Sequence, residues 1–389
     1  MSLVIACTAP SGSSLEPGAS VEATTTSTDP NASRSADPGP VVSPDPSPDP
    51  TPDPAPSFAP PALNWRRHVL PGLAYQSVLQ HHGRYIALGP DLADQRDEFS
   101  VLVSDDGLTW RTLVRRPFDG QIPVSMMLVG GRLIVIAWRD LGPESGERVV
   151  WRSDDGKAWE IWMDGASHGE SFARIGDRWL MLTEYGGGIQ SSPDGTNWTT
   201  ELPLHAAAEG AGLTVGPAGV LAPVTQEGQD GPGRSWMYLS LDGTDWTEGT
   251  FEDAADTFIA QAAANEAGYV AVGLGSYQTA PSTSRAWWSA DGATWQRAVV
   301  PDLFEQSRFY PNEIVSYGSG FLVTATPEVE GPDRMLWTSD GRTWQFVEGG
   351  PDLLYEGTGL VVDGGRVLWY GYELTDPEVR TLWEATPIE

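Results

Sequence analysis

The stretch Ser-Asp-Asp-Gly-Leu-Thr-Trp at residues 104–110 is the most informative part of this sequence, because its frame recurs five more times. In each copy a Ser or Thr is followed two residues later by Asp-Gly, and a Trp stands three residues after the Gly. The six copies end at Trp110, Trp159, Trp198, Trp246, Trp295 and Trp344. The intervals between these residues are 49, 39, 48, 49 and 49, and self-similarity at such a period is typical of a propeller or a solenoid.

The composition favours short strands and disfavours nucleic acid as a partner. Among 389 residues there are 44 Gly, 32 Pro and 17 Trp, which suits strands joined by tight turns, and we expect no helix of any length. The net charge of −30 lacks the basic footprint that binding to a phosphate backbone requires. It suits an exported surface or a cationic partner.

Each repeat contains four strand-like segments, which in the first unit are residues 77–81, 85–89, 99–104 and 109–114. A Gly-bearing turn joins the first two segments, and the Asp-Gly turn, a strong hairpin signal, joins the last two. The sequence therefore predicts an all-β fold of four-stranded antiparallel blades.

A seventh unit begins at residues 359–362 but ends after its third strand, residues 380–384. Residues 64–70 read like residues 109–114, the fourth strand of the first unit. We therefore predict a seven-bladed β-propeller over residues 64–389, in which this N-terminal strand completes the last blade and removes a pair of exposed sheet edges.

The recurring frame resembles the Asp-box, or BNR, repeat of sialidases, sortilin-type receptors and some xyloglucan-cleaving glycosidases. The resemblance covers residues 65–389, and its Asp-Gly form is one residue tighter than the spacing usual in sialidases. It implies turns on the outer rim, away from the central site, so that the boxes are structural. The residues to which this role applies, besides the six tryptophans, are Asp106, Asp155, Asp194, Asp242, Asp291 and Asp340.

The N-terminal region predicts a surface anchor followed by a stalk. Val4-Ile5-Ala6-Cys7 resembles the lipobox of bacterial lipoproteins, in which the Cys is lipidated, so residues 1–7 are interpreted as the remnant of a signal. Residues 8–63 are rich in Pro, Ser, Thr and Asp and cannot bury enough apolar area to fold. We expect an exported monomer that is attached to the bacterial cell surface through Cys7 and contacts the membrane only through its lipid.

Binding residues are expected on the face where the loops between second and third strands converge. These loops are long and acidic in most units, whereas the third unit has only five residues, 184–188, after Thr183. A missing loop predicts a notch beside Tyr185, although the third unit could simply tolerate a deletion. The other residues predicted to border the notch are Arg139, Glu144, Glu227 and Asp230.

Catalytic and metal-binding motifs give no specific signal. Tyr355-Glu356 is a weak substitute for the Tyr-Glu pair of sialidases, and the arginines that begin third strands are expected to pair with the acidic loops. The five histidines show no ligand spacing. The acidic loops are either solvated or able to bind a divalent cation, and no cofactor or catalytic residue is predicted.

The function expected from these features is binding of a surface glycan, peptide or protein through the loop-rich face. The alternative is a glycoside hydrolase of exo-sialidase or xyloglucanase type. That alternative needs two carboxylates, or a Tyr with a Glu, facing each other across the channel.

Overall fold

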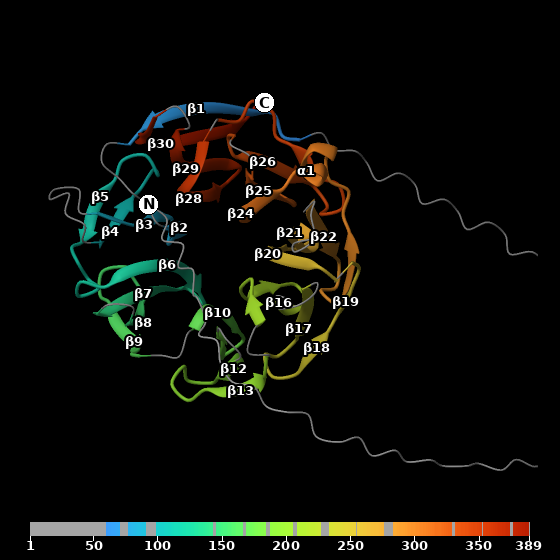
Figure 1. The fold of residues 1–389 in the computed structure, drawn as a ribbon. Coiled ribbons are helices and arrows are strands. Elements are labelled where there is room, and N and C mark those ends of the chain that lie inside the picture. Colours follow the sequence, from blue (N-terminus) through green and yellow to red (C-terminus); the bar gives the residue numbers. More distant parts are fainter. Residues whose placement is uncertain are drawn as a thin grey trace, which may run out of the picture. The chain divides into compact units, whose positions relative to one another are not determined.

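In this computed structural model the described residues are 60–70, 77–90, 99–142, 145–165, 169–183, 187–204, 208–226, 233–253, 255–275, 283–328, 331–351, 353–373 and 376–388. Only the backbone is described for Ser145, Ala208, Glu209 and residues 353–358, 372–373 and 376–380. All of them belong to one unit, residues 58–389. They form seven sheets arranged in a ring, which confirms the predicted seven-bladed propeller (Figure 1). Cys7 and residues 8–59 lie outside the described residues.

Blades 1, 2 and 3 are four-stranded antiparallel sheets in which sequence neighbours pair. Their strands are β2(Ser77–His81), β3(Arg84–Pro90), β4(Phe99–Ser104) and β5(Arg111–Val114); β6(Ile122–Val129), β7(Arg132–Gly142), β8(Ser145–Ser153) and β9(Glu160–Met163); and β10(Gly169–Ile175), β11(Arg178–Thr183), β12(Gly188–Ser192) and β13(Thr199–Leu202).

Blades 4, 5 and 6 follow the same plan with two local variations. Their strands are β14(Ala208–Gly210), β15(Thr214–Gly216), β16(Gly219–Gln226), β17(Arg234–Ser240) and β18(Trp246–Glu248); β20(Thr257–Asn265), β21(Gly268–Gly275), β22(Thr283–Ser289) and β23(Thr294–Arg297); and β24(Phe309–Tyr317), β25(Gly320–Pro327), β26(Arg334–Thr338) and β27(Gln345–Phe346). The inner strand of blade 4 is split into β14 and β15, and β19(Thr250–Phe251) adds a parallel fifth strand to blade 5.

Blade 7 closes the ring as predicted. It contains β28(Leu353–Asp363), β29(Arg366–Glu373), β30(Asp376–Pro387) and, as its outermost strand, β1(Leu63–Val69). In the register of β1 and β30, Trp65 lies opposite Ala385 and Arg67 opposite Trp383. The two ends of the domain are therefore held together by one antiparallel strand pair.

The core lies between blades, because both faces of each sheet are covered by a neighbouring blade. The second strand of a blade is buried most completely: every residue of β21, with the sequence Gly-Tyr-Val-Ala-Val-Gly-Leu-Gly, is buried. A strand covered on both faces needs an apolar run and not an alternating pattern. The inner strands β2, β6, β10, β20, β24 and β28 surround the centre (Figure 1).

Two features differ from the sequence prediction. First, a short helix, α1(Asp302–Gln306), was not expected; it follows Pro301, and its buried Phe304 stacks on Phe309 with 5.4 Å between ring centroids. Second, the acidic connection predicted in blade 2 is mostly paired strand, because β7 and β8 continue to the pair Gly142 and Ser145. Among the described residues no helix is long and apolar enough to cross a bilayer.

Candidate functional site

The Asp-box carboxylates are engaged by their own turns. Asp106 Oδ1 accepts the backbone N–H groups of Leu108 and Thr109 at 2.8 and 2.7 Å. The hydroxyl oxygen of Ser104 accepts the N–H of Gly107 at 2.8 Å, and Gly107 has a φ of 75°. The left-handed backbone explains the glycine, since other residues adopt this region only at a cost.

The same bonds recur in the other five boxes. In one of them the backbone N–H groups of Thr244 and Asp245 lower the pKa of Asp242 to about 2. A carboxylate held in this way is stabilised in its charged form and is poorly suited to accept or donate a proton. These contacts agree with a structural role, which stays a prediction until it is tested.

A cavity of about 590 Å³ lies in the central channel, lined by residues from the first half and the middle of the innermost strands. The second-to-third connections emerge at the end where these strands begin, and the part of the channel toward that end is called the channel mouth. Every blade contributes to its lining. In each blade one lining residue stands four positions before the end of the inner strand, and these residues are Ser77, Ser125, Ser171, Gly212, Gln261, Glu313 and Gly359. The volume is within the range of about 300–1,000 Å³ that small-molecule sites occupy.

A repeated β-bulge shapes this cavity. In blades 2, 3, 5 and 6 the register of the innermost strand shifts by one residue at the same height. The extra residues are Val124, Glu170, Ala260 and Asn312, and all four line the cavity. A bulge places two successive side chains opposite one partner residue, so each blade presents two side chains where a regular strand would present one.

Two of the lining residues are carboxylates that enter from opposite sides of the ring. Glu170 lies on β10 of blade 3, and Glu313 lies on β24 of blade 6. Figure 1 shows these two strands on opposite sides of the centre. Arg148 Nη1 of blade 2 lies 3.6 Å from Glu170 Oε1, an ion pair between neighbouring blades.

Glu313 has the more unusual environment. Its Oε2 accepts the backbone N–H of Leu360 at 2.7 Å, which ties blade 6 to blade 7. Burial raises the pKa of Glu313 to about 8, against the opposing effect of the Leu360 N–H. At neutral pH this side chain is therefore mostly protonated and can both donate and accept a hydrogen bond.

The inter-blade tie alone does not require a glutamate. Ser171 stands four residues before the end of β10, as Glu313 does in β24, and its hydroxyl oxygen accepts the N–H of Leu213 at 2.9 Å. A serine thus makes the equivalent tie between blades 3 and 4. The longer acidic side chain at position 313 adds a carboxyl group to the cavity.

A second buried acid lies behind the cavity wall. The Asn312 amide donates to Thr326 Oγ1 at 2.8 Å, and the Thr326 hydroxyl donates to Asp333 Oδ1 at 2.6 Å. Asp333 is only 3% exposed, and burial raises its pKa to about 6. Asp333 belongs to the acidic connection predicted between the second and third strands of blade 6. Of the two expectations for these acids, solvation is wrong for Asp333, because the fold buries its side chain.

The residues predicted around the notch are only partly described. Tyr185, Glu144, Glu227 and Asp230 lie outside the described residues, so the notch stays a prediction. Arg139 on β7 is held by Glu147 Oε1 at 2.6 Å and Asp164 Oδ1 at 2.7 Å.

The other residues predicted on this face are the Tyr355-Glu356 pair and the arginines that begin third strands. Tyr355 and Glu356 lie in β28, but their side chains are not described. Two arginines that begin third strands have partners on strands: Arg148 Nη1 lies 3.6 Å from Glu170 Oε1, and Arg234 Nη2 lies 3.4 Å from Glu248 Oε1. The acidic loop residues next to them, Glu144, Glu227 and Asp230, lie outside the described residues, so pairing with the loops stays a prediction. Among the described residues no group of three or more His, Cys, Asp or Glu side chains is placed to hold a metal ion.

Glu170 and Glu313 were not among the predicted site residues, because acids were expected in the loops. The usable signal was a carboxylate inside an innermost strand, at a height where the lining residues of the other blades are uncharged. The β-bulges that direct side chains toward the channel at these positions have no recognisable sequence pattern.

No protein-family model and no curated protein sequence matches this chain. Among solved structures, the GH74 xyloglucanase from Xanthomonas campestris is similar with a TM-score of 0.54 and 15% identity. The match covers 79% of this chain and 52% of the xyloglucanase, so the chain spans about half the length of that enzyme.

Two further structures are similar at lower scores. The β-propeller domain of the Trilobed protease from Pyrococcus furiosus has a TM-score of 0.49 and 11% identity, covering 81% of this chain and 95% of that domain. The Trypanosoma rangeli sialidase has a TM-score of 0.41 and 11% identity, covering 80% of this chain and 55% of the sialidase. Likeness at these identities shows the propeller fold alone.

Proposed function

We propose that this chain is a glycan-binding propeller whose ligand occupies the channel mouth. The observation that carries the proposal is the cavity of about 590 Å³ to which all seven blades contribute. Hydroxyl, amide and carboxyl groups converge there from Ser125, Ser171, Gln261 and Asn312 together with the two glutamates. A few convergent donors and acceptors in a concave site suit a ligand rich in hydroxyl groups.

The charge of the site favours a neutral sugar over an acidic one. Among the described residues that line the cavity there are two carboxylates and no Lys or Arg. A carboxylated sugar such as sialic acid would need a guanidinium or ammonium partner, since an unpaired buried charge is costly. The overall charge of −30 acts in the same direction.

Blocking the channel mouth tests this proposal. Ala260 lines the cavity and is half-buried, so Ala260→Trp should fill the mouth and abolish binding to xyloglucan or linear arabinan in affinity electrophoresis. Leu241→Trp, at an exposed Asp-box turn, is the matched control and should bind as the wild type does. Retained binding by Ala260→Trp would contradict the channel-mouth site.

A glycoside hydrolase is the second candidate, and one observation favours it. Glu313 and Glu170 enter the same cavity from opposite sides, and the raised pKa of Glu313 suits a general acid at neutral pH. In this role Glu313 would protonate the glycosidic oxygen, and Glu170, paired with Arg148, would act as the carboxylate on the other side of the sugar.

Release of reducing sugar from the same polysaccharides separates the two candidates. A hydrolase predicts that Glu313→Gln and Glu170→Gln each lower turnover by about 100- to 10,000-fold while binding persists. A binding protein predicts no turnover by the wild type on any of these polysaccharides.

Family membership and anchoring belong to the same proposal. The six turns with their repeated Asp, Ser or Thr and Gly contacts support placing the chain among Asp-box propellers.

The Cys7 context and the Pro-rich segment after it support a lipid-anchored protein held away from a bacterial surface. In that setting the propeller would present its channel mouth to extracellular glycans.

A further inference from the structure

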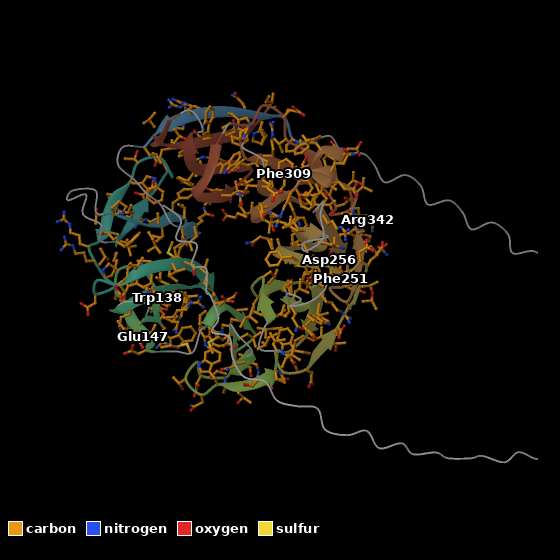
Figure 2. All side chains as sticks on the ribbon, in the orientation of Figure 1. Trp138, Glu147, Phe251, Asp256, Phe309 and Arg342 are labelled. Atoms are coloured by element: carbon orange, nitrogen blue, oxygen red, sulfur yellow. The ribbon has the colours of Figure 1, made fainter. Side chains whose placement is uncertain are left out.

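We propose that Trp138, backed by Gly146, is a stacking platform for a neutral sugar ring next to the one in the channel mouth. The proposal rests on the glycan-binding function above and specifies its ligand as an oligosaccharide of at least two rings. Trp138 and Glu147 both lie on blade 2, where Figure 2 labels them. Trp138 as a residue is 37% exposed.

The backbone holds the indole in a defined position. A Cβ atom at Gly146 would collide with the Cζ2, Cε2 and Nε1 atoms of Trp138. The ring therefore lies against the backbone of the β7–β8 hairpin at Gly146, and this glycine leaves room for it. Contact on one side and exposure of the rest is the arrangement that stacking on an aromatic face requires.

The side of blade 2 that carries Trp138 faces blade 3. Lower on the same strand, Ile134 and Ile136 pack against Phe172 and Met181 of blade 3. Side chains two residues apart on a strand point to the same face, so Trp138 projects from the same face of β7 as Ile134 and Ile136.

Arg148, the residue opposite Trp138, lies between the platform and the cavity. Arg148 is the cross-strand partner of Trp138, and it contacts Glu170, which lines the channel mouth. One row of side chains thus runs from the indole to the cavity.

The apolar surface continues toward the channel on β6. Ile122 lies opposite Trp138 in the register and is 50% exposed. Val124, on the same strand, is exposed and lines the cavity. In blade 3, which this side of blade 2 faces, β11 ends at Thr183 and β12 begins at Gly188. The platform therefore lies on the side of blade 2 that faces the blade for which the notch is predicted.

The chemistry of this surface fits a neutral sugar ring, pyranose or furanose. Such a ring has an apolar face of C–H groups that packs on an indole, and a rim of hydroxyl groups that need polar partners. Arg148 and Glu170 provide charged groups between the platform and the cavity. A comparable aromatic residue, Tyr310, is 38% exposed, but the guanidinium of Arg308 lies 4.7 Å from its ring centroid and covers it.

Affinity electrophoresis in gels that contain xyloglucan or linear arabinan tests the platform. Trp138→Ala should weaken the dissociation constant at least tenfold, and Trp138→Phe should recover part of the loss. Gly146→Ala should weaken binding as Trp138→Ala does, because it keeps the indole but displaces it. Gly146 has no positive φ, and the atoms that a Cβ would meet belong to a partly exposed side chain, so this change should lower the melting temperature only slightly.

Tyr310→Ala is the matched control and should bind as the wild type does. If Trp138→Ala and Gly146→Ala bind as tightly as the wild type while Ala260→Trp does not bind, the platform is wrong and the channel-mouth site stands. If the wild type binds neither polysaccharide, both proposals fail.

Discussion

Glu313 combines a structural contact with a place in the cavity, and its environment makes stability depend on pH. Burial raises its pKa from 4.5 to about 8, so between these values the folded chain binds more protons than the unfolded chain. Its contribution to stability is therefore complete below pH 4.5 and is lost as pH rises toward 8.

Glu313→Gln should remove this dependence. The glutamine oxygen can still accept the N–H of Leu360, but the side chain has no proton to lose. Urea unfolding between pH 5 and 9 should show the variant gaining stability relative to the wild type as the pH rises. Glu266→Gln, at an exposed hairpin turn, is the control, and a constant difference between Glu313→Gln and the wild type would contradict the assignment.

Trp295 tests whether an Asp-box holds the fold. It is 2% exposed, its Nε1 donates to Gly292 O at 2.9 Å, and its ring lies 6.4 Å from that of Tyr269. Trp295→Ala should lower the free energy of unfolding by about 3–5 kcal/mol, as expected for a buried aromatic residue. Thr294→Ala, at the neighbouring exposed position, serves as control. A stable Trp295→Ala protein that has lost glycan binding would instead assign the box to function.

Among the elements, β1 matters most, because it joins the first part of the domain to the last. Its register with β30 runs from Leu63 opposite Pro387 to Val69 opposite Thr381. Leu63 is buried with Trp337 and Trp369, and His68 Nε2 lies 3.0 Å from Glu384 Oε2. Without β1 the edge of β30 would be exposed.

Two deletions test this closure by thermal unfolding. Removing residues 1–60 leaves β1 intact and should leave the melting temperature nearly unchanged. Removing residues 1–72 also deletes β1 and should lower the melting temperature by on the order of 10 °C, since several kcal/mol of packing are lost. Equal melting temperatures for the two deletions would rule out a stabilising role for β1.

The innermost strands show how an element can decide function without changing the fold. Their bulges add one side chain per blade to the channel wall in blades 2, 3, 5 and 6. The β7–β8 hairpin extends blade 2 past this level and carries Trp138 with it. Both features leave the order of strands unchanged, so related propellers can differ in ligand while keeping the same architecture.

For the whole molecule, the open question is where the propeller works. The proposed anchor predicts that protein made with its native signal carries an acylated Cys7, detectable by mass spectrometry of membrane extracts. Cys7→Ser should release the protein into the medium, with Ser13→Ala in the following segment as control. An unmodified Cys7 in protein from the full gene would contradict the anchor.

The sequence by itself determined the number of blades, their four-stranded plan and the closing strand. These follow from local and repeated signals. One is an Asp-Gly turn that recurs about every 49 residues, and the other is that the last unit lacks a fourth strand while residues 64–70 resemble one. Turn chemistry depends on residues a few positions apart, so a reader of the sequence can see it directly.

Only the tertiary structure decided which acids meet. Glu170 and Glu313 are 143 residues apart, and no local pattern relates them. Their convergence depends on ring closure, which brings the inner strands of seven blades around one axis, and on the bulges in these strands. The burial of Asp333 and the position of Trp138 against Gly146 are likewise set by contacts that exist only once the blades are assembled.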